Sequence, residues 1–166
     1  MVVNLPPLGR VMAVDWGGAR LGIAVSDPTR TLATPHSTLA EKDKGLQIRR
    51  VAALVTELEA VLVLVGIPRH LDGNASDTTV TAEKYATKLA TVIAPIPVVR
   101  VDERLSTVEA EEKLAATSRR PSQKQKGLVD RAAAAVLLQA WLDAQPRPTS
   151  TTTAPALPAP LTEPEP

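Results

Sequence analysis

The stretch VMAVDWGGARLGIAVSDP, residues 11–28, predicts two strands joined by a tight turn. Val11–Trp16 is apolar throughout except for Asp15, which is typical of a central strand that is covered on both faces. Two glycines interrupt this run, and Arg20–Ser26 follows as the second strand of a hairpin. A carboxylate inside a buried strand is costly unless a partner compensates its charge. Asp15 is therefore the first candidate functional residue.

The rest of the chain alternates between helical periodicity and short buried runs. Three early strands followed by this alternation predict an α/β domain with a mixed sheet and helices on its faces. This is the outline of the ribonuclease H fold. After the hairpin, the expected elements are a strand over Ala33–Leu39, a helix over Lys44–Glu59, a strand over Val61–Pro68, a helix that Ser76 or Asp77 caps and that reaches Ile93, a strand over Pro97–Glu103, a helix from Ser106 to Ala116 and a helix over Leu128–Ala144.

Length and composition predict one folded domain with two flanking segments. The chain has 166 residues, of which 44% are apolar, and Phe is absent, so the core must be built from aliphatic side chains. We expect a nuclease-like domain over residues 11–145, an N-terminal extension over residues 1–10 and a disordered tail rich in Pro, Thr and Ala over residues 146–166.

Composition also excludes several classes of site. Without cysteine there are no disulfides or thiolate zinc sites, and the two histidines lack metal-ligand spacing. The scarcity of aromatic residues argues against a protein that stacks unpaired bases, and the net charge of +1 indicates no global electrostatic attraction to a partner. The N-terminus lacks a signal peptide and no apolar run approaches about 20 residues, so we predict a cytoplasmic protein without membrane contact.

A second candidate carboxylate lies in VVRVDERLST, residues 98–107. Side chains of a strand alternate between its two faces, so Glu103 shares a face with Val99 and Val101. Asp102 shares the opposite face with Arg100. Parity therefore aims Glu103 at the interior, although a bulge at the strand end would exchange it for Asp102.

A third candidate is Asp130 in GLVDRAAAAVLLQAW, residues 127–141. On a helix, Asp130 shares a face with Ala134, Leu137 and Trp141, and this face is expected to pack on the sheet. Asp130 then lies near the open end of a buried stripe whose small alanines allow a close approach.

Each carboxylate also has a purely structural interpretation. Asp15 could start a turn, and Asp130 could be a favourable charge near a helix N-terminus. Glu103 could pair with Arg104 or Arg100. These interpretations do not explain why all three carboxylates occupy sheet-facing positions. A divalent cation does, because it neutralises clustered carboxylates, so Asp15, Glu103 and Asp130 are the predicted ligands of Mg²⁺ or Mn²⁺, with two ions expected.

Four segments together resemble the RuvX (YqgF) family of RuvC-like proteins in the ribonuclease H-like superfamily. They are AVDWGGARLGIAVSD, VLVGIPRHLDG, VRVDERLSTVEA and QKGLVDRAAAAVLLQAWLD, and they span Ala13–Asp143. The resemblance implies a five-stranded sheet in the order 3-2-1-4-5. It implies a hydrolase, an endonuclease that acts as a Holliday junction resolvase in DNA recombination and repair or that matures the 5′ end of pre-16S ribosomal RNA. It also places catalytic acids at Asp15, Glu103 and Asp130.

One departure from the wider superfamily affects the site. Many relatives carry a carboxylate at the end of the fourth strand, where this chain has Gly66. In the implied strand order Glu103 lies two strands from Asp15, and a glycine between them leaves room for the longer glutamate side chain. Asp102 remains the substitute for Glu103.

Basic residues near the same end of the domain are predicted to hold nucleic-acid phosphates without sequence preference. A solvated loop is the alternative for those in the run over residues 119–126. The predicted contacts are Arg20, Arg69, Arg104, Arg119, Arg120, Lys124 and Lys126.

The sequence leaves the substrate and some rival functions open. A four-way DNA junction and a precursor RNA are equally compatible with the acidic site, and symmetric cleavage of a junction would require a homodimer. One rival is a non-catalytic nucleic-acid-binding module linked to transcription. Another is an actin-like phosphate-binding domain, because Asp15, Gly17 and Gly22 match its first phosphate loop.

Overall fold

The computed structural model describes residues 5–69, 76–103 and 123–146. None of the helices within these ranges is long and apolar enough to cross a membrane. The elements are β1 (Arg10–Trp16), β2 (Arg20–Ser26), β3 (Ala33–Ala40), α1 (Lys44–Glu57), β4 (Ala60–Ile67), α2 (Asp77–Ile93), β5 (Val98–Asp102) and α4 (Gln123–Ala144).

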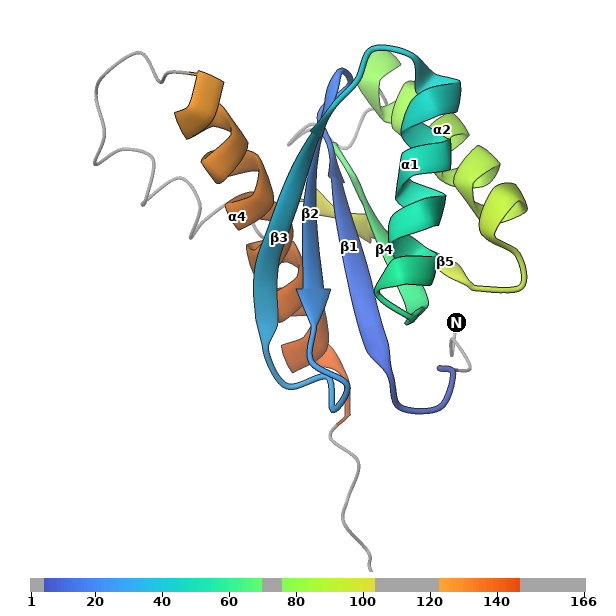
Figure 1. The fold of residues 1–166 in the computed structure, drawn as a ribbon, viewed down its shortest axis with the longest axis vertical. Coiled ribbons are helices and arrows are strands. Elements are labelled where there is room, and N and C mark those ends of the chain that lie inside the picture. Colours follow the sequence, from blue (N-terminus) through green and yellow to red (C-terminus); the bar gives the residue numbers. More distant parts are fainter. Residues whose placement is uncertain (1–4, 70–75, 104–122, 147–166) are drawn as a thin grey trace, which may run out of the picture.

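The strands form one mixed sheet in the order β3-β2-β1-β4-β5 (Figure 1). The central strand, β1, is antiparallel to β2 and parallel to β4. On the outside, β3 pairs antiparallel with β2, and β5 pairs parallel with β4. This arrangement confirms the predicted α/β class and the ribonuclease H-like strand order. It also brings the C-terminal ends of β1, β4 and β5 to the same edge of the sheet.

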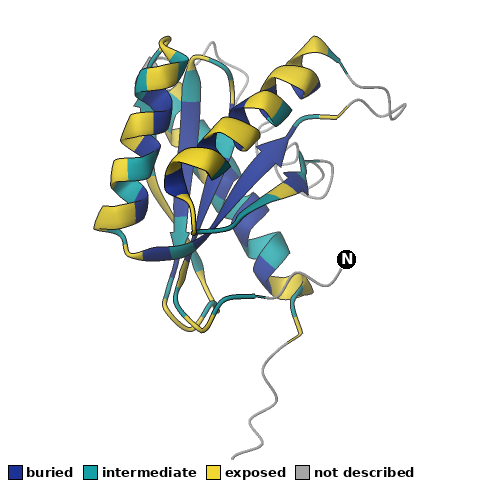
Figure 2. Cartoon of the chain, turned by 90° about the vertical axis from the view of Figure 1, so that its right-hand side faces the viewer, coloured by how far each residue is buried: buried dark blue, intermediate teal, exposed yellow. Residues whose placement is uncertain are grey.

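Helices cover both faces of the sheet. Figure 1 shows α1 and α2 on one face and α4 on the other. Alternate residues of β1 serve the two layers: Met12 and Val14 enter the core under α1 and α2, whereas Val11 and Ala13 enter the core under α4. All four are completely buried, and Figure 2 shows the same burial along the central strands. Burial on both faces explains why this strand is continuously apolar in the sequence.

Side-chain caps fix the starts of α1 and α2. The Asp43 carboxylate accepts a hydrogen bond from the Leu46 amide at 2.8 Å. Ser76, one of the two predicted caps of α2, accepts from the Thr79 amide at 3.2 Å. The Thr79 hydroxyl in turn donates to the Pro68 carbonyl oxygen at 2.6 Å, which ties the start of α2 to the end of β4. Such caps satisfy amide groups that have no partner within the helix.

The closest approach of α4 to the sheet is at Gly22 of β2. A Cβ atom at this position would lie 1.9 Å from the carbonyl oxygen of Asp130, so only glycine fits without movement of the helix. One turn earlier in α4, the Gly127 carbonyl oxygen accepts a hydrogen bond from the Thr38 hydroxyl of β3 at 2.6 Å. These two contacts fix the first turns of α4 over β2 and β3.

The expected start of the last helix is wrong. α4 begins at Gln123 instead of Leu128, so the last four residues of the run predicted as a basic loop, 123–126, are helical. Lys and Gln favour helices, and packing on the sheet offsets the cost of Gly127 inside one. The helix expected over 106–116 and the tail from residue 147 lie outside the described residues. The other predicted bounds within the described residues agree with the observed ones or differ by one or two residues.

Alanine substitutions at two glycines test the packing of α4. We expect Gly22→Ala to destabilise the protein by about 3 kcal/mol, because its methyl group meets backbone atoms that cannot rotate away. Gly127→Ala is the matched control: its Cβ would meet Thr38 atoms only at 3.6 Å or more, and alanine favours a helix, so stability should rise by about 0.5–1 kcal/mol. Urea unfolding measures both changes, and equal effects of the two substitutions would contradict this packing.

Candidate active site

Asp15 lies near the C-terminal end of β1 and shares its face with Val11 and Ala13, the face that α4 covers. Its partners in the sheet are Gly22 on β2 and Gly66 on β4. Neither partner has a side chain, so the space beside the Asp15 carboxyl group is filled from other elements. The backbone of α4 lies over the first glycine, and the side chain of Glu103 lies over the second.

Glu103 follows β5 directly and reaches back over β4. A Cβ atom on Gly66 would lie 3.0 Å from a Glu103 carboxyl oxygen and 3.1 Å from a methyl group of Leu137, so glycine makes the space that the sequence predicts at this position. Asp102 lies on the opposite face, and its carboxylate is 3.9 Å from the Nε atom of Arg69. The two adjacent acids therefore serve different layers, as strand parity predicts.

The carboxyl groups of Asp15 and Glu103 are hydrogen-bonded to each other. Burial raises the pKa of Glu103 to about 8, and the charge of Asp15 and the hydrogen bond to it act in the same direction. Burial also raises the pKa of Asp15; the bond from Glu103 opposes this rise and the charge of Asp130 adds to it. Two carboxyl groups in contact must share a proton, so near neutral pH Glu103 donates and Asp15 accepts.

Asp130 faces the same region from the first half of α4, but it is bound by an arginine. The Nε and Nη2 atoms of Arg20 donate to one Asp130 carboxylate oxygen at 2.9 and 2.5 Å. Both side chains are largely buried, with 26% of the Arg20 side chain and 30% of the Asp130 side chain exposed. The guanidinium group balances a carboxylate that would otherwise face the Asp15–Glu103 pair.

The structure therefore brings together two of the three predicted ligands. Within the described ranges, no group of three or more acidic or histidine side chains is arranged so that it could hold a metal ion. Asp15, Glu103 and Asp130 are thus not assembled as a triad among the described residues, and the Asp130 carboxylate is instead bound by Arg20.

The predicted phosphate contacts fall into three groups. Arg20 and Arg69 lie at the expected end of the sheet, and each is close to a carboxylate, Asp130 for the first and Asp102 for the second. Lys126 is exposed at the start of α4. Lys124 lies in the first turn of that helix, and its side chain is not among the described parts of the structure. Arg104, Arg119 and Arg120 also lie outside the described residues.

Sequence reasoning missed the bond between Arg20 and Asp130, which are 110 residues apart. The alternation of β2 contains a usable signal, because Arg20 and Gly22 share one face of that strand. A glycine at an inward position indicates that another backbone lies close by. Arg20, two residues before Gly22, is then expected to lie beside a carboxylate on the approaching segment.

Comparison with known proteins identifies the family of this chain. The sequence model of RuvX, described as "Holliday junction resolvase", matches residues 9–144. The chain belongs to the RuvX family. This confirms the family and the nuclease class that the four sequence segments suggested.

Individual relatives agree with this placement. A protein of Mycolicibacterium paratuberculosis, provisionally named a pre-16S rRNA nuclease, is 46% identical over 138 residues, which cover 83% of this chain and 82% of that protein. A protein of the same name from Mycobacterium tuberculosis is 44% identical, with coverage of 83% and 81%. The structure of Thermus thermophilus RuvC with a Holliday junction aligns with 17% identity and a TM-score of 0.48, over 78% of this chain and 91% of RuvC.

The partly buried carboxyl pair predicts a pH dependence of stability without metal. The pKa of Glu103 lies near 8 in the folded protein and near 4.5 as its ordinary value, so the folded state binds the proton more tightly. Its stabilising effect is complete below about 4.5 and is lost as the pH rises through about 8. We therefore expect the midpoint of thermal unfolding in EDTA to fall across this window.

Glu103→Gln should flatten that dependence, because the amide cannot ionise. The control is Glu57→Gln, which changes an exposed glutamate of α1 and should leave the slope as in the wild type. A Glu103→Gln protein whose unfolding keeps the wild-type pH dependence would contradict the assignment of the shifted group.

Proposed function

We propose that this chain is a divalent-metal-dependent endonuclease that hydrolyses phosphodiester bonds in structured nucleic acid, with precursor 16S ribosomal RNA as its substrate. The observation that carries the proposal is the contact of two partly buried carboxyl groups, Asp15 and Glu103, where the parallel strands end. Such a pair is unfavourable for folding, since both groups cannot ionise without repulsion. Groups of this kind are typical of sites that bind a cation or move protons.

The chemistry of the pair fits Mg²⁺ or Mn²⁺. Carboxylate oxygens are the hard ligands that these ions prefer, and Asp15 and Glu103 would supply the first of them. Asp130 would join them when Arg20 releases it. A bound divalent ion supplies a Lewis acid and lowers the pKa of a water molecule, and a pair of ions is the number that the sequence predicts.

Arg20 has two uses in this proposal. In the structure its guanidinium group binds Asp130, which leaves α4 charge-balanced beside the carboxyl pair. Guanidinium groups bind carboxylates and phosphates with the same planar geometry, so an arriving phosphodiester can take the place of the carboxylate. Arg20 would then hold the substrate while Asp130 becomes free to complete the acidic site.

The substrate class rests on relatives and on charge. Two mycobacterial relatives carry a name that refers to pre-16S rRNA, and the family description refers to Holliday junctions. We choose the RNA because the named relatives are 44–46% identical over most of both chains. Exposed Lys126 at the start of α4 and Arg69 beyond β4 support phosphate binding near the acids. The cytoplasmic location and the homodimer remain predictions from the sequence.

A cleavage assay with two substrates in parallel tests the proposal. The purified protein is incubated with Mg²⁺ or Mn²⁺ and either a pre-16S RNA fragment or a four-way DNA junction. We expect metal-dependent cleavage of the RNA. Cleavage of the junction alone would move the substrate to DNA, and the absence of any metal-dependent cleavage would favour the non-catalytic binding module.

Paired substitutions distinguish the active carboxylate from its neighbour. Glu103→Gln should lower the cleavage rate by about a hundredfold or more, because a lost metal ligand removes several kcal/mol of transition-state stabilisation. Asp102→Asn is the matched control, since its side chain lies on the other face of β5 and should leave most of the activity. The reverse ranking of the two single-turnover rates would overturn the assignment.

Thermal unfolding distinguishes a ligand from a structural Asp15. Asp15→Asn removes one charge and keeps the shape, so in EDTA the variant should be as stable as the wild type or slightly more stable. Added Mn²⁺ should then raise the unfolding temperature of the wild type more than that of the variant, because ligands that bind only the folded state stabilise it. Asp15 would instead be a structural residue if the variant unfolds at a much lower temperature than the wild type in EDTA and if Mn²⁺ raises both unfolding temperatures equally.

A further inference from the structure

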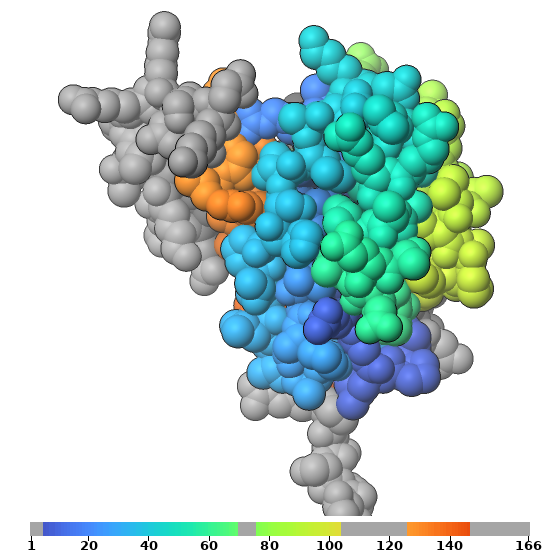
Figure 3. Space-filling view, in the orientation of Figure 1, coloured from blue at the N-terminus to red at the C-terminus, as the bar shows by residue number. Residues whose placement is uncertain are grey.

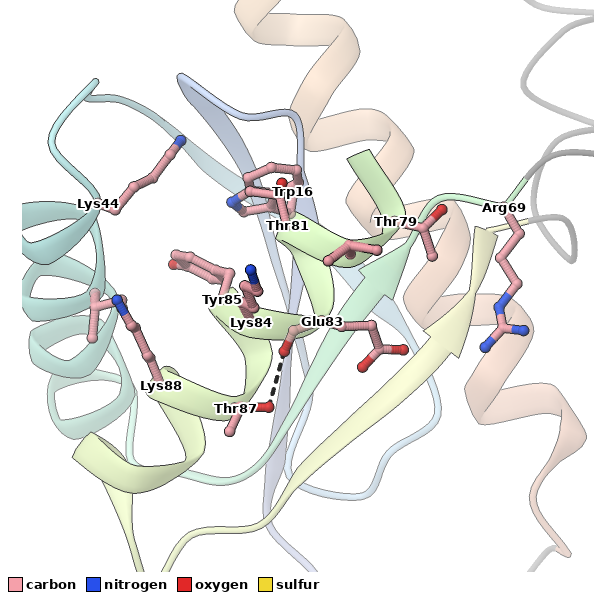
Figure 4. A pocket seen from close by; sticks show the side chains of 12 residues that line it. Trp16, Lys44, Arg69, Thr79, Thr81, Glu83, Lys84, Tyr85, Thr87 and Lys88 are labelled. Carbon is pink, nitrogen blue, oxygen red and sulfur yellow. Dashed lines mark hydrogen bonds between the residues drawn. The ribbon is translucent and has the colours of Figure 1, made fainter. Parts of the chain in front are cut away.

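A groove between α1 and α2 lies on the face of the sheet opposite α4. These two helices lie side by side on that face, and Figure 3 shows them as neighbouring surfaces. A pocket of about 680 Å³ opens beside α2, and Figure 4 shows side chains of α1, α2 and the end of β1 around it. A second hollow of about 430 Å³ continues along the two helices and shares Ile48 and Lys88 with the first. Together they form a continuous surface feature outside the acidic site.

The floor of this groove is mainly apolar and buried. Trp16, Ile48 and Tyr85 line it, and each is more than nine-tenths buried. The rings of Trp16 and Tyr85 are 6.1 Å apart, and the Nζ atom of Lys44 lies 5.0 Å from the centre of the Trp16 ring. Within the described residues, the indole N–H and the phenol O–H have no hydrogen-bond partner. The floor therefore holds polar hydrogens and a cation in an apolar setting.

Cations line both sides of the groove. Lys84 and Lys88 are four residues apart on α2, which places them about 6 Å apart along its axis. Lys44 and Arg49 face them from α1. We call the surface formed by Lys44, Arg49, Lys84 and Lys88 the basic groove. The whole chain has a net charge of only +1, so this concentration of positive charge is local.

The nearby acid does not neutralise the basic groove. Among the described residues that line the two hollows, the single carboxylate is that of Glu83. It points toward β5, where the Nε atom of Arg100 donates to it at 2.5 Å. The lysines on the α1 side of α2 are therefore left to attract an anion from solution.

The basic groove begins at the same end of the sheet as the acidic site. Trp16 on its floor directly follows Asp15 in β1, and the two side chains enter opposite layers. The Lys44 ammonium group also donates to the carbonyl oxygen of Gly18 in the turn after β1. A strand of nucleic acid that leaves the acidic site across this turn meets Lys44 first and then the other cations.

We propose that the basic groove binds the phosphates of the substrate strand that continues beyond the cleaved bond, an inference that rests on the proposed function. The groove supplies point charges on flexible stems, which suit a backbone of repeated phosphates and require no sequence. An acidic peptide would satisfy the same charges. The nucleic acid is favoured because the groove starts beside the site that receives phosphodiesters.

Binding of two RNAs to the full chain tests the inference. One RNA is a short duplex without extensions, and the other carries a single-stranded extension of about ten nucleotides, within the range that a single-strand groove accommodates. The double variant Lys84→Ala/Lys88→Ala should bind the extended RNA more weakly. Its salt dependence should fall by about 1.4 log–log units, because each lost single-strand phosphate contact removes about 0.7. Binding of the short RNA should stay as in the wild type.

Charge-matched single variants provide the control. Lys88→Glu reverses a charge in the basic groove, and Arg10→Glu reverses one at the opposite end of β1, where it should have little effect on the extended RNA. Fluorescence anisotropy in EDTA measures binding without cleavage, and thermal unfolding checks that every variant is folded.

The outcomes separate this inference from the proposed function. Groove variants that bind the extended RNA with wild-type affinity and salt dependence overturn the inference, even where the wild type cleaves RNA. Equal losses on both RNAs, or equal losses for Lys88→Glu and Arg10→Glu, also overturn it. Failure of the wild type to bind either RNA overturns both proposals, whereas binding that depends on the groove without cleavage supports the groove and contradicts only the nuclease.

Discussion

The contact between α4 and Gly22 determines where the acidic residues meet. Because β2 offers no side chain at this point, the helix backbone rests directly on the strand beside Asp15. Asp130 is thereby held within electrostatic range of Asp15, and Arg20 on the same strand reaches its carboxylate. On the other side of Asp15, Gly66 makes equivalent space for Glu103. A central carboxylate between two glycines is thus the constraint that shapes the site.

Consecutive residues at the ends of β1 and β5 point to opposite faces of the sheet. Asp15 faces α4 while Trp16 faces α1 and α2, and Glu103 faces α4 while Asp102 lies beside Arg69. Alternation of side chains makes this separation automatic in an extended chain. The acidic site and the basic groove can therefore lie close together at one edge of the sheet without sharing a side chain.

Much of this arrangement is predictable from the sequence because it depends on local periodicity. The apolar run of β1 indicates a strand buried on both faces, and parity at the end of β5 is sufficient to place Glu103 and Asp102 on different sides. The glycine that replaces a carboxylate at the end of β4 indicates the space that Glu103 fills.

What the sequence does not reveal depends on contacts between distant segments. The bond from Arg20 to Asp130 joins residues 110 positions apart. The alternation of β2 indicates that a backbone approaches beside Arg20, but it does not identify Asp130 as the partner. The start of α4 is equally non-local, because Lys126 and its neighbours become helical through packing of the helix on β2 and β3. The basic groove also arises only because α1 and α2 lie side by side. In the sequence of either helix alone, its lysines have the pattern of ordinary solvent-facing residues.

The scarcity of aromatic residues gives the molecule a separate optical reporter in each layer. The chain has two tryptophans and one tyrosine. Trp16 lies under Lys44 at the floor of the basic groove, whereas Trp141 is a partly buried residue of α4 that packs against the core on the other face of the sheet. The emission of an indole depends on the charges and solvent around it, so replacement of one tryptophan leaves a signal from a single face of the sheet. Binding or unfolding on either face of the sheet can thus be followed separately by tryptophan fluorescence in an unlabelled protein.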